Sequence, residues 1–149
     1  MGETLAAVRL PCAGANLRRA ARVATQLYEE ELRPSGVRAT QFTLLQALQL
    51  APGISQKQLG ELLGIDSTTL TRTLAGLRRK GWLLSPPGED RRELRLSLTP
   101  AGLREFRRVV PYWEAAQKRL RQVLGGREWN RVIDAAVRIA EVVPKVARR

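Results

Sequence analysis

The stretch that determines the fold class is residues 55–102, SQKQLGELLGIDSTTLTRTLAGLRRKGWLLSPPGEDRRELRLSLTPAG. Its first four residues are typical of a capping box, in which the Ser55 hydroxyl accepts a hydrogen bond from the Gln58 amide and the Gln58 side chain reaches back. The helix that follows is predicted to end at Gly64, because glycine tolerates the left-handed conformation common at helix C-termini.

A second helix follows after a very short connection. Only Ile65 lies between the end of the first helix and the next cap, which is either Asp66 or Ser67. This second helix is predicted to run to Lys80 and to end at Gly81. Two short helices joined by so tight a turn are typical of a helix-turn-helix.

Beyond the second helix the pattern changes from a helical period to alternation. Trp82 and Leu84 alternate before a Pro-Pro-Gly loop. After the loop, apolar residues alternate with polar ones at Leu94, Leu96 and Leu98. This pattern predicts an antiparallel hairpin whose leucine-rich strand anchors it to the core and whose charged tip is residues 89–93.

Long amphipathic helices are predicted on both sides of this segment. The N-terminal side has one helix over about Pro11 to Leu32 and another over about Thr40 to Ala51. On the C-terminal side, Thr99 caps a long helix with a heptad seam from Leu103 to Leu124, and a last helix covers Trp129 to Val143. These seams are too extensive for one small lobe to cover, so we expect a homodimer.

The helix over residues 67–80 has two distinct faces at about 100° per residue. The face expected to point into the core carries Leu70, Leu74 and Leu77. The opposite face carries Thr68, Arg72, Ala75 and Arg79. Arginine matches guanine in the major groove, and threonine matches base edges or phosphate. The hydroxyls and amides of the first turn also offer a phosphate site, although an ordinary solvated helix would show the same pattern.

Composition narrows the class of function. The chain has 149 residues, 44% of them hydrophobic, which is enough for the core of one domain. Its formal net charge of +12 favours a polyanionic partner such as nucleic acid. That charge rises along the chain, from +1 in residues 1–36 to +4 in 37–102 and +7 in 103–149. Charge therefore supports nucleic-acid binding without locating it.

The composition of the chain excludes several kinds of metal site and catalytic site. The chain has no histidine and one cysteine, Cys12, so histidine-based metal sites, cysteine clusters and the common nucleophile–base pairs are excluded. We therefore expect no enzyme activity, no cofactor and no metal. No apolar run approaches the roughly 20 residues of a membrane span, which favours a cytoplasmic protein. We expect Cys12 to be an inert, partly packed thiol, with a redox-active one as the alternative.

These motifs resemble those of the MarR (multiple antibiotic resistance regulator) family, and the similarity covers nearly the whole chain. It rests on DSTTLTR at 66–72, LRRKG at 77–81, and DRR at 90–92 before LSLT at 96–99. The resemblance implies a mainly α protein with a small two- or three-stranded β wing. The expected architecture is a winged helix-turn-helix flanked by N- and C-terminal dimerisation helices.

The resemblance also assigns roles to residues. Together with the exposed helix face, it predicts DNA contacts from Ser67, Thr68, Thr69, Arg72, Arg79, Asp90, Arg91 and Arg92. Arg92 is expected in the minor groove, with Asp90 bracing the wing tip and Arg91 meeting phosphate. An arginine on a thin hairpin suits a narrow minor groove.

The expected function is a sequence-specific double-stranded DNA-binding transcriptional regulator, a ligand-responsive homodimeric repressor on a pseudo-palindromic operator. The alternative is a protein-interaction regulator with only weak, non-specific nucleic-acid binding. Residues 1–36 and 103–149 are expected to dimerise, and 37–102 to bind DNA, within one integrated domain. The resemblance implies a small aromatic or phenolic ligand. Tyr28, Arg18 and Trp113 could line its pocket, but a structural role is favoured for each, so no ligand residue is assigned.

Overall fold

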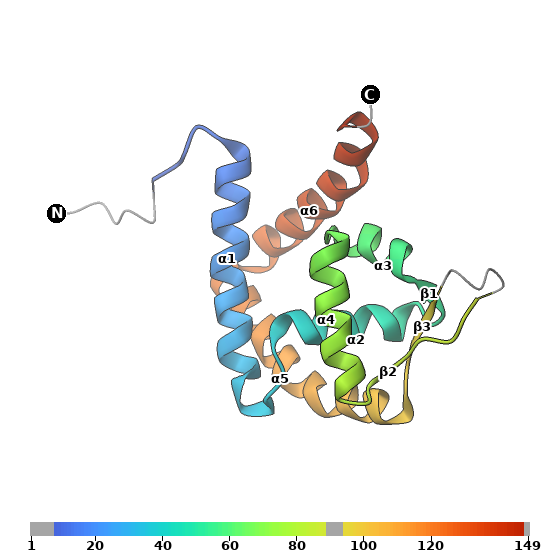
Figure 1. The fold of residues 1–149 in the computed structure, drawn as a ribbon. Coiled ribbons are helices and arrows are strands. Elements are labelled where there is room, and N and C mark those ends of the chain that lie inside the picture. Colours follow the sequence, from blue (N-terminus) through green and yellow to red (C-terminus); the bar gives the residue numbers. More distant parts are fainter. Residues whose placement is uncertain (1–7, 89–93, 148–149) are drawn as a thin grey trace.

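A three-stranded antiparallel sheet and two groups of helices make up the computed structural model, which describes residues 8–88 and 94–147 (Figure 1). The predicted fold class, mainly α with a small β wing, is confirmed. The elements in chain order are α1 (Ala13–Leu32), the 3-10 helix η2 (Arg33–Ser35), α2 (Ala39–Leu50), β1 (Ile54–Ser55), α3 (Gln56–Leu63), α4 (Ser67–Arg79), β2 (Leu83–Leu84), β3 (Arg95–Leu98), α5 (Pro100–Leu124) and α6 (Gly126–Ala147).

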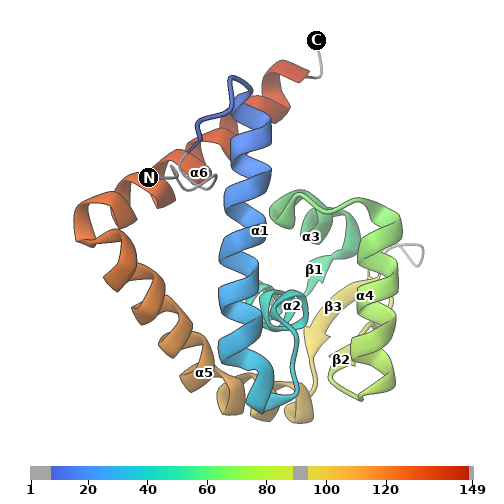
Figure 2. The ribbon, with the colours of Figure 1, turned by 90° about the vertical axis from the view of Figure 1, so that its left-hand side faces the viewer.

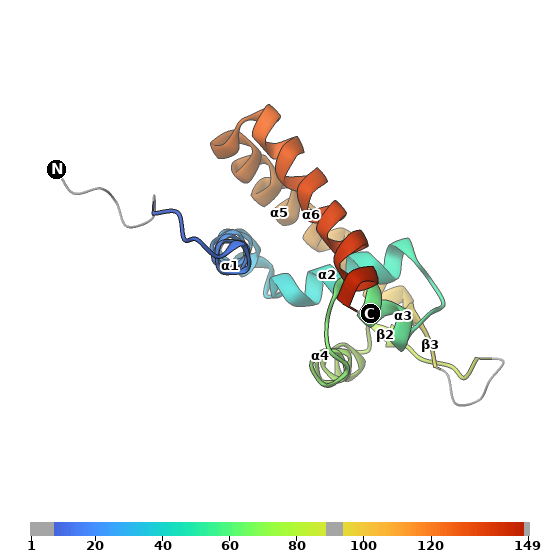
Figure 3. The ribbon, with the colours of Figure 1, turned by 90° about the horizontal axis from the view of Figure 1, so that it is seen from above.

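The structure has two parts, which we call the lobe (α2, α3, α4 and the sheet) and the frame (α1, α5 and α6). Figure 2 shows α5 and α6 diverging from their connection as a V, with α1 crossing in front of it. The lobe of α2, α3, α4 and the sheet lies on the other side of α1. Figure 3 shows the molecule from above, with α1 and the α5–α6 connection on one side and α4 and the sheet on the other. The chain passes from frame to lobe at η2 and returns at the start of α5.

The predicted helix caps are confirmed. The Ser55 hydroxyl accepts from the Gln58 amide at 3.2 Å, and the Gln58 side chain accepts from the Ser55 amide at 3.0 Å. Asp66 caps α4, and Thr99 caps α5, accepting from the Gly102 amide at 2.9 Å. Each side chain satisfies a backbone donor that the first helical turn leaves without an intrahelical partner.

The sheet has the strand order β1-β3-β2, and β1 contributes a third strand beside the predicted hairpin. Ile54 of β1 pairs with Leu96, and Leu83 of β2 pairs with Leu98. In β2, Leu83 is buried, whereas Leu84 is 49% exposed, so the core-facing side of this strand carries Leu83. Two residues are too few for alternation to show which side faces the core.

Leu94 differs from its predicted role as a core anchor. Its side chain is 37% exposed, whereas Leu96 is fully buried and Leu98 is partly buried. Leu94 lies before β3 begins and makes only an isolated bridge to Pro87. The hairpin is therefore anchored from Leu96 onward, and its stem continues outward beyond the core.

Two clusters of buried side chains form the core, and both include partly buried aromatic neighbours. The larger one fills the lobe: Leu44, Leu45, Ala47, Leu48, Leu59, Leu70, Leu74, Leu77, Leu83 and Leu96. The smaller one joins α1, α2 and α5: Leu32, Val37, Phe42 and Val109. Trp82 and Phe106 pack against both clusters. Phe106 stacks on Phe42 with ring centroids 5.6 Å apart.

The frame helices expose apolar side chains. On α6 these are Val132, Ile133, Val137, Ile139, Val142 and Val143, each at least 40% exposed. Cys12 at the start of α1 is exposed, so the prediction of a partly packed thiol is wrong. Among the described residues, no helix combines the length and apolar character that a bilayer span requires.

Candidate nucleic-acid interface

Helix α4 has one buried and one exposed side, as its sequence predicts. Its three core leucines are at most 1% exposed. The five predicted contact residues on this helix are all exposed: Ser67, Thr68, Thr69, Arg72 and Arg79. The buried leucines fix the rotation of the helix about its axis, so Thr68, Arg72 and Arg79 face outward together.

The first turn of α4 is organised by Asp66. Its carboxylate accepts from the Thr69 amide at 2.9 Å, and this hydrogen bond lowers the pKa of Asp66. The side chain is therefore an anion at neutral pH, and the Thr69 amide already has a partner. Phosphate binding at this end would depend on the hydroxyls of Ser67 and Thr68 rather than on that amide.

Helix α3 packs tightly against α4 across the turn. A Cβ on Gly60 would lie 3.2 Å from the Ile65 carbonyl oxygen and 3.4 Å from a Leu70 methyl group, so glycine permits this approach. At the exposed edge of the pair, the Gln56 side-chain amide donates to the Thr71 hydroxyl at 2.8 Å. This hydrogen bond was not predicted, because a bond between separate helices leaves no signal in the spacing of either helix.

The C-terminal end of α4 is tied to the hairpin. Arg78 donates to the Ser85 hydroxyl at 3.0 Å, and the Lys80 ammonium lies 4.4 Å from the centre of the Trp82 ring. Of the three consecutive basic residues 78–80, Arg78 and Lys80 are therefore engaged within the protein. The third, Arg79, is exposed on the outer face of the helix.

The hairpin stem extends away from the lobe core. Beyond β2 and β3, Pro87 and Leu94 form a bridge, and the Arg95 amide donates to the Pro86 carbonyl at 2.9 Å. Figure 1 shows this stem at the edge of the molecule, on the side away from α1. Three predicted contact residues, Asp90, Arg91 and Arg92, lie outside the described residues.

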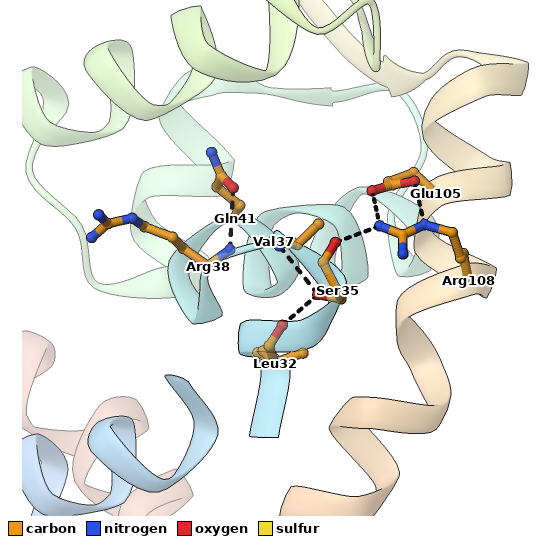
Figure 4. A network of polar contacts seen from close by, with 7 residues as sticks. All are labelled: Leu32, Ser35, Val37, Arg38, Gln41, Glu105 and Arg108. Atoms are coloured by element: carbon orange, nitrogen blue, oxygen red, sulfur yellow. Dashed lines mark hydrogen bonds and ion pairs between the residues drawn. The ribbon is translucent and has the colours of Figure 1, made fainter. Parts of the chain in front are cut away.

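A polar network fixes the lobe to the frame (Figure 4). Arg108 of α5 donates to the Ser35 carbonyl at 2.7 Å and forms an ion pair with Glu105 at 2.6 Å. The Ser35 hydroxyl donates to the Leu32 carbonyl and accepts from the Val37 amide. The hydrogen bond with Arg108 lowers the pKa of Glu105, so the pair stays charged at neutral pH. The connection into α2 is thereby held against α5.

A cavity of about 190 Å³ lies near this junction, between α1, α2 and α5. Tyr28 and Trp113 line it, but Arg18 does not. The other lining residues are Thr25, Leu32, Ala39, Phe42, Thr43 and Gln46. Burial raises the pKa of the Tyr28 phenol, which is therefore neutral and able to donate a hydrogen bond. Within the described part of the chain, no group of three or more acidic or cysteine side chains is placed to hold a metal ion.

Known proteins are similar to this chain in sequence and in fold. The model of the MarR family matches residues 35–93. The Mycobacterium tuberculosis transcriptional regulator MosR, crystallised with DNA, is 33% identical with a TM-score of 0.79, over 91% of this chain and 98% of that one.

Curated relatives also match this chain over shorter segments, and two of them show the extent of the similarity. The regulator YwoH of Bacillus subtilis is 28% identical over 93 residues, which are 62% of this chain and 68% of YwoH. The multiple antibiotic resistance protein MarR of Salmonella typhimurium is 36% identical over 78 residues, which are 52% of this chain and 54% of MarR. This chain belongs to the MarR family of transcriptional regulators.

Proposed function

We propose that the protein is a cytoplasmic, sequence-specific double-stranded DNA-binding regulator, a ligand-responsive homodimeric repressor rather than an enzyme. The observation that carries the proposal is the outer face of α4, where Thr68, Arg72 and Arg79 are exposed opposite a leucine core. Hydroxyl and guanidinium groups on one helix face suit the major groove. The DNA complex of the relative MosR supports the same conclusion.

DNA binding and dimerisation are assigned to three segments of one integrated domain. Residues 37–102 bind DNA, using α4 and the wing residues Asp90, Arg91 and Arg92. Residues 1–36 and 103–149 form the dimer, an assignment supported by the apolar side chains that α6 exposes. Two α4 helices related by a two-fold axis would read a pseudo-palindromic operator with half-sites one helical turn apart, about 34–36 Å.

The cavity beside Tyr28 and Trp113 is the candidate site for a small aromatic or phenolic ligand. It lies where the lobe meets the frame, so an occupant would contact both. For the ligand to relieve repression, it must bind the free protein more tightly than the DNA-bound protein, because equal affinity shifts no equilibrium.

Selection from a random duplex pool tests the proposal. The protein should enrich an inverted repeat and bind it at least about 10³-fold more tightly than random duplex. The affinity should fall steeply with salt, because phosphate neutralisation releases counterions. Enrichment of no sequence, with weak binding to every duplex, would instead support the protein-interaction regulator.

A further inference from the structure

The outer edge of the helix-turn-helix carries an ordered amide that the proposed DNA contacts leave unused. Gln56 is the first residue of α3 and directly follows the buried cap residue Ser55. Its side-chain nitrogen donates to the Thr71 hydroxyl at 2.8 Å, across the boundary between α3 and α4. Thr71 is exposed and directly precedes Arg72. The amide therefore lies beside the surface proposed to enter the groove.

We propose that Gln56 reads an adenine in each half-site and that Thr71 positions the Gln56 amide for this contact. The assignment rests on the proposed function, since it presupposes a DNA-bound α4. Thr71 lies about 70° around the helix from the middle of the outer face, on the side toward α3. Gln56 therefore extends that face beyond α4.

The hydrogen-bonding groups of this amide match adenine. A glutamine amide has two N–H groups and a carbonyl oxygen, and Thr71 uses one N–H. The remaining N–H and the carbonyl fit the N7 acceptor and the N6 amino donor of adenine, the bidentate pairing of glutamine in the major groove. Phosphate would pair with the N–H alone and leave the carbonyl without a donor. The neighbouring exposed Lys57 is better suited to phosphate.

The bond to Thr71 restricts the rotation of the amide before DNA arrives. Ordering a long polar side chain on binding costs conformational entropy, and an amide already held loses less of it. Thr71 therefore acts through Gln56 as a positioning residue. Serine at position 71 would keep the hydroxyl, whereas valine would keep the shape and remove the hydrogen bond.

A base-pair scan of the selected operator tests the assignment. The parent should prefer adenine at one position of each half-site by roughly 5- to 150-fold, the range for one bidentate contact. Gln56→Met should abolish this preference and keep those at other positions. Thr71→Val should reduce it at the same position, and Thr71→Ser should retain it. Gln56→Glu should move the preference from adenine to cytosine, whose amino group a carboxylate accepts.

Lys57→Ala is the matched control, expected to weaken binding to every duplex equally and to lower the salt slope by about one per subunit. The same uniform weakening from Gln56→Met would overturn the adenine assignment and make Gln56 a phosphate contact. An unchanged preference in Thr71→Val would overturn the positioning role. A parent protein without any preferred duplex would instead overturn the proposed function, which separates the two failures.

Discussion

Gly102, the third residue of α5, lies directly against the backbone of Trp82. A Cβ at this position would be 2.2 Å from the Trp82 carbonyl oxygen. Backbone cannot yield as a flexible side chain would, so Gly102→Ala should lower the free energy of unfolding by at least about 1–3 kcal/mol. Gly76→Ala is the control, because nothing lies within 4 Å of its Cβ and alanine favours helix by up to about 1 kcal/mol. Chemical denaturation of both variants measures the difference, and equal stabilities would contradict the expected clash.

Arg72 is expected to contact a base edge. Arg72→Ala should weaken operator binding by roughly 1–3 kcal/mol for each half-site whose base the guanidinium reads, and relax the preference at one position there. Affinities for single-base-pair variants of the operator measure this effect, with Arg138→Ala on α6 as the control for removal of one exposed arginine. Equal weakening on all duplexes would reassign Arg72 to phosphate.

Hydrogen bonds between residues close together in the chain can be predicted from the sequence, whereas those between distant residues cannot. Ser55 and Thr99 are recognisable as caps because a cap and its amide partner lie three residues apart. The hydrogen bond from Arg108 to the Ser35 carbonyl is not, because it joins positions 73 residues apart and one partner is a backbone atom. The exposed contact residues of α4 follow from periodicity, whereas the Gln56 bond to Thr71 depends on how the two helices pack.

At the scale of elements, the first turn of α4 depends on Asp66. Asp66→Ala should release the Thr69 amide and speed its hydrogen exchange, while Asp66→Asn keeps an acceptor and most of the protection. The pKa of Asp66 is lowered in the folded state, so its stabilisation is complete above its ordinary value of 3.8 and disappears as the pH falls through the lower folded value. Unchanged Thr69 exchange in Asp66→Ala would show that the cap is dispensable.

Whole elements differ in how well their sequences predict them. Each long helix repeats its apolar pattern over several turns, so its existence is clear from sequence, although its predicted ends can differ from the observed ones by a few residues. Strand β1 is two residues long and exists through pairing with β3, some 40 residues later. A two-residue strand is too short to show an alternating pattern, and nothing in its own sequence indicates the distant strand with which it pairs.

At the scale of the whole molecule, α6 should hold the dimer together. Its apolar side chains remain exposed in the single chain, and Ile133 and Val137, four residues apart, lie on one side of the helix. Val137→Asp, or deletion of residues 126–149, should yield monomers at micromolar concentration in sedimentation. Arg138→Asp places the same charge at the next position around the helix, away from Ile133 and Val137, and should remain dimeric. A dimeric deletion variant would move the interface elsewhere.

Trp82 and Phe106, which contact both core clusters, bear on how such a protein can diversify. Recombination that joined this lobe to a foreign frame would replace part of the packing around both aromatic rings. Substitutions on the outer face of α4, by contrast, disturb no buried contact. Lineages descended from such a chain should therefore inherit lobe and frame as one block, and acquire new target sequences through changes at a few surface positions.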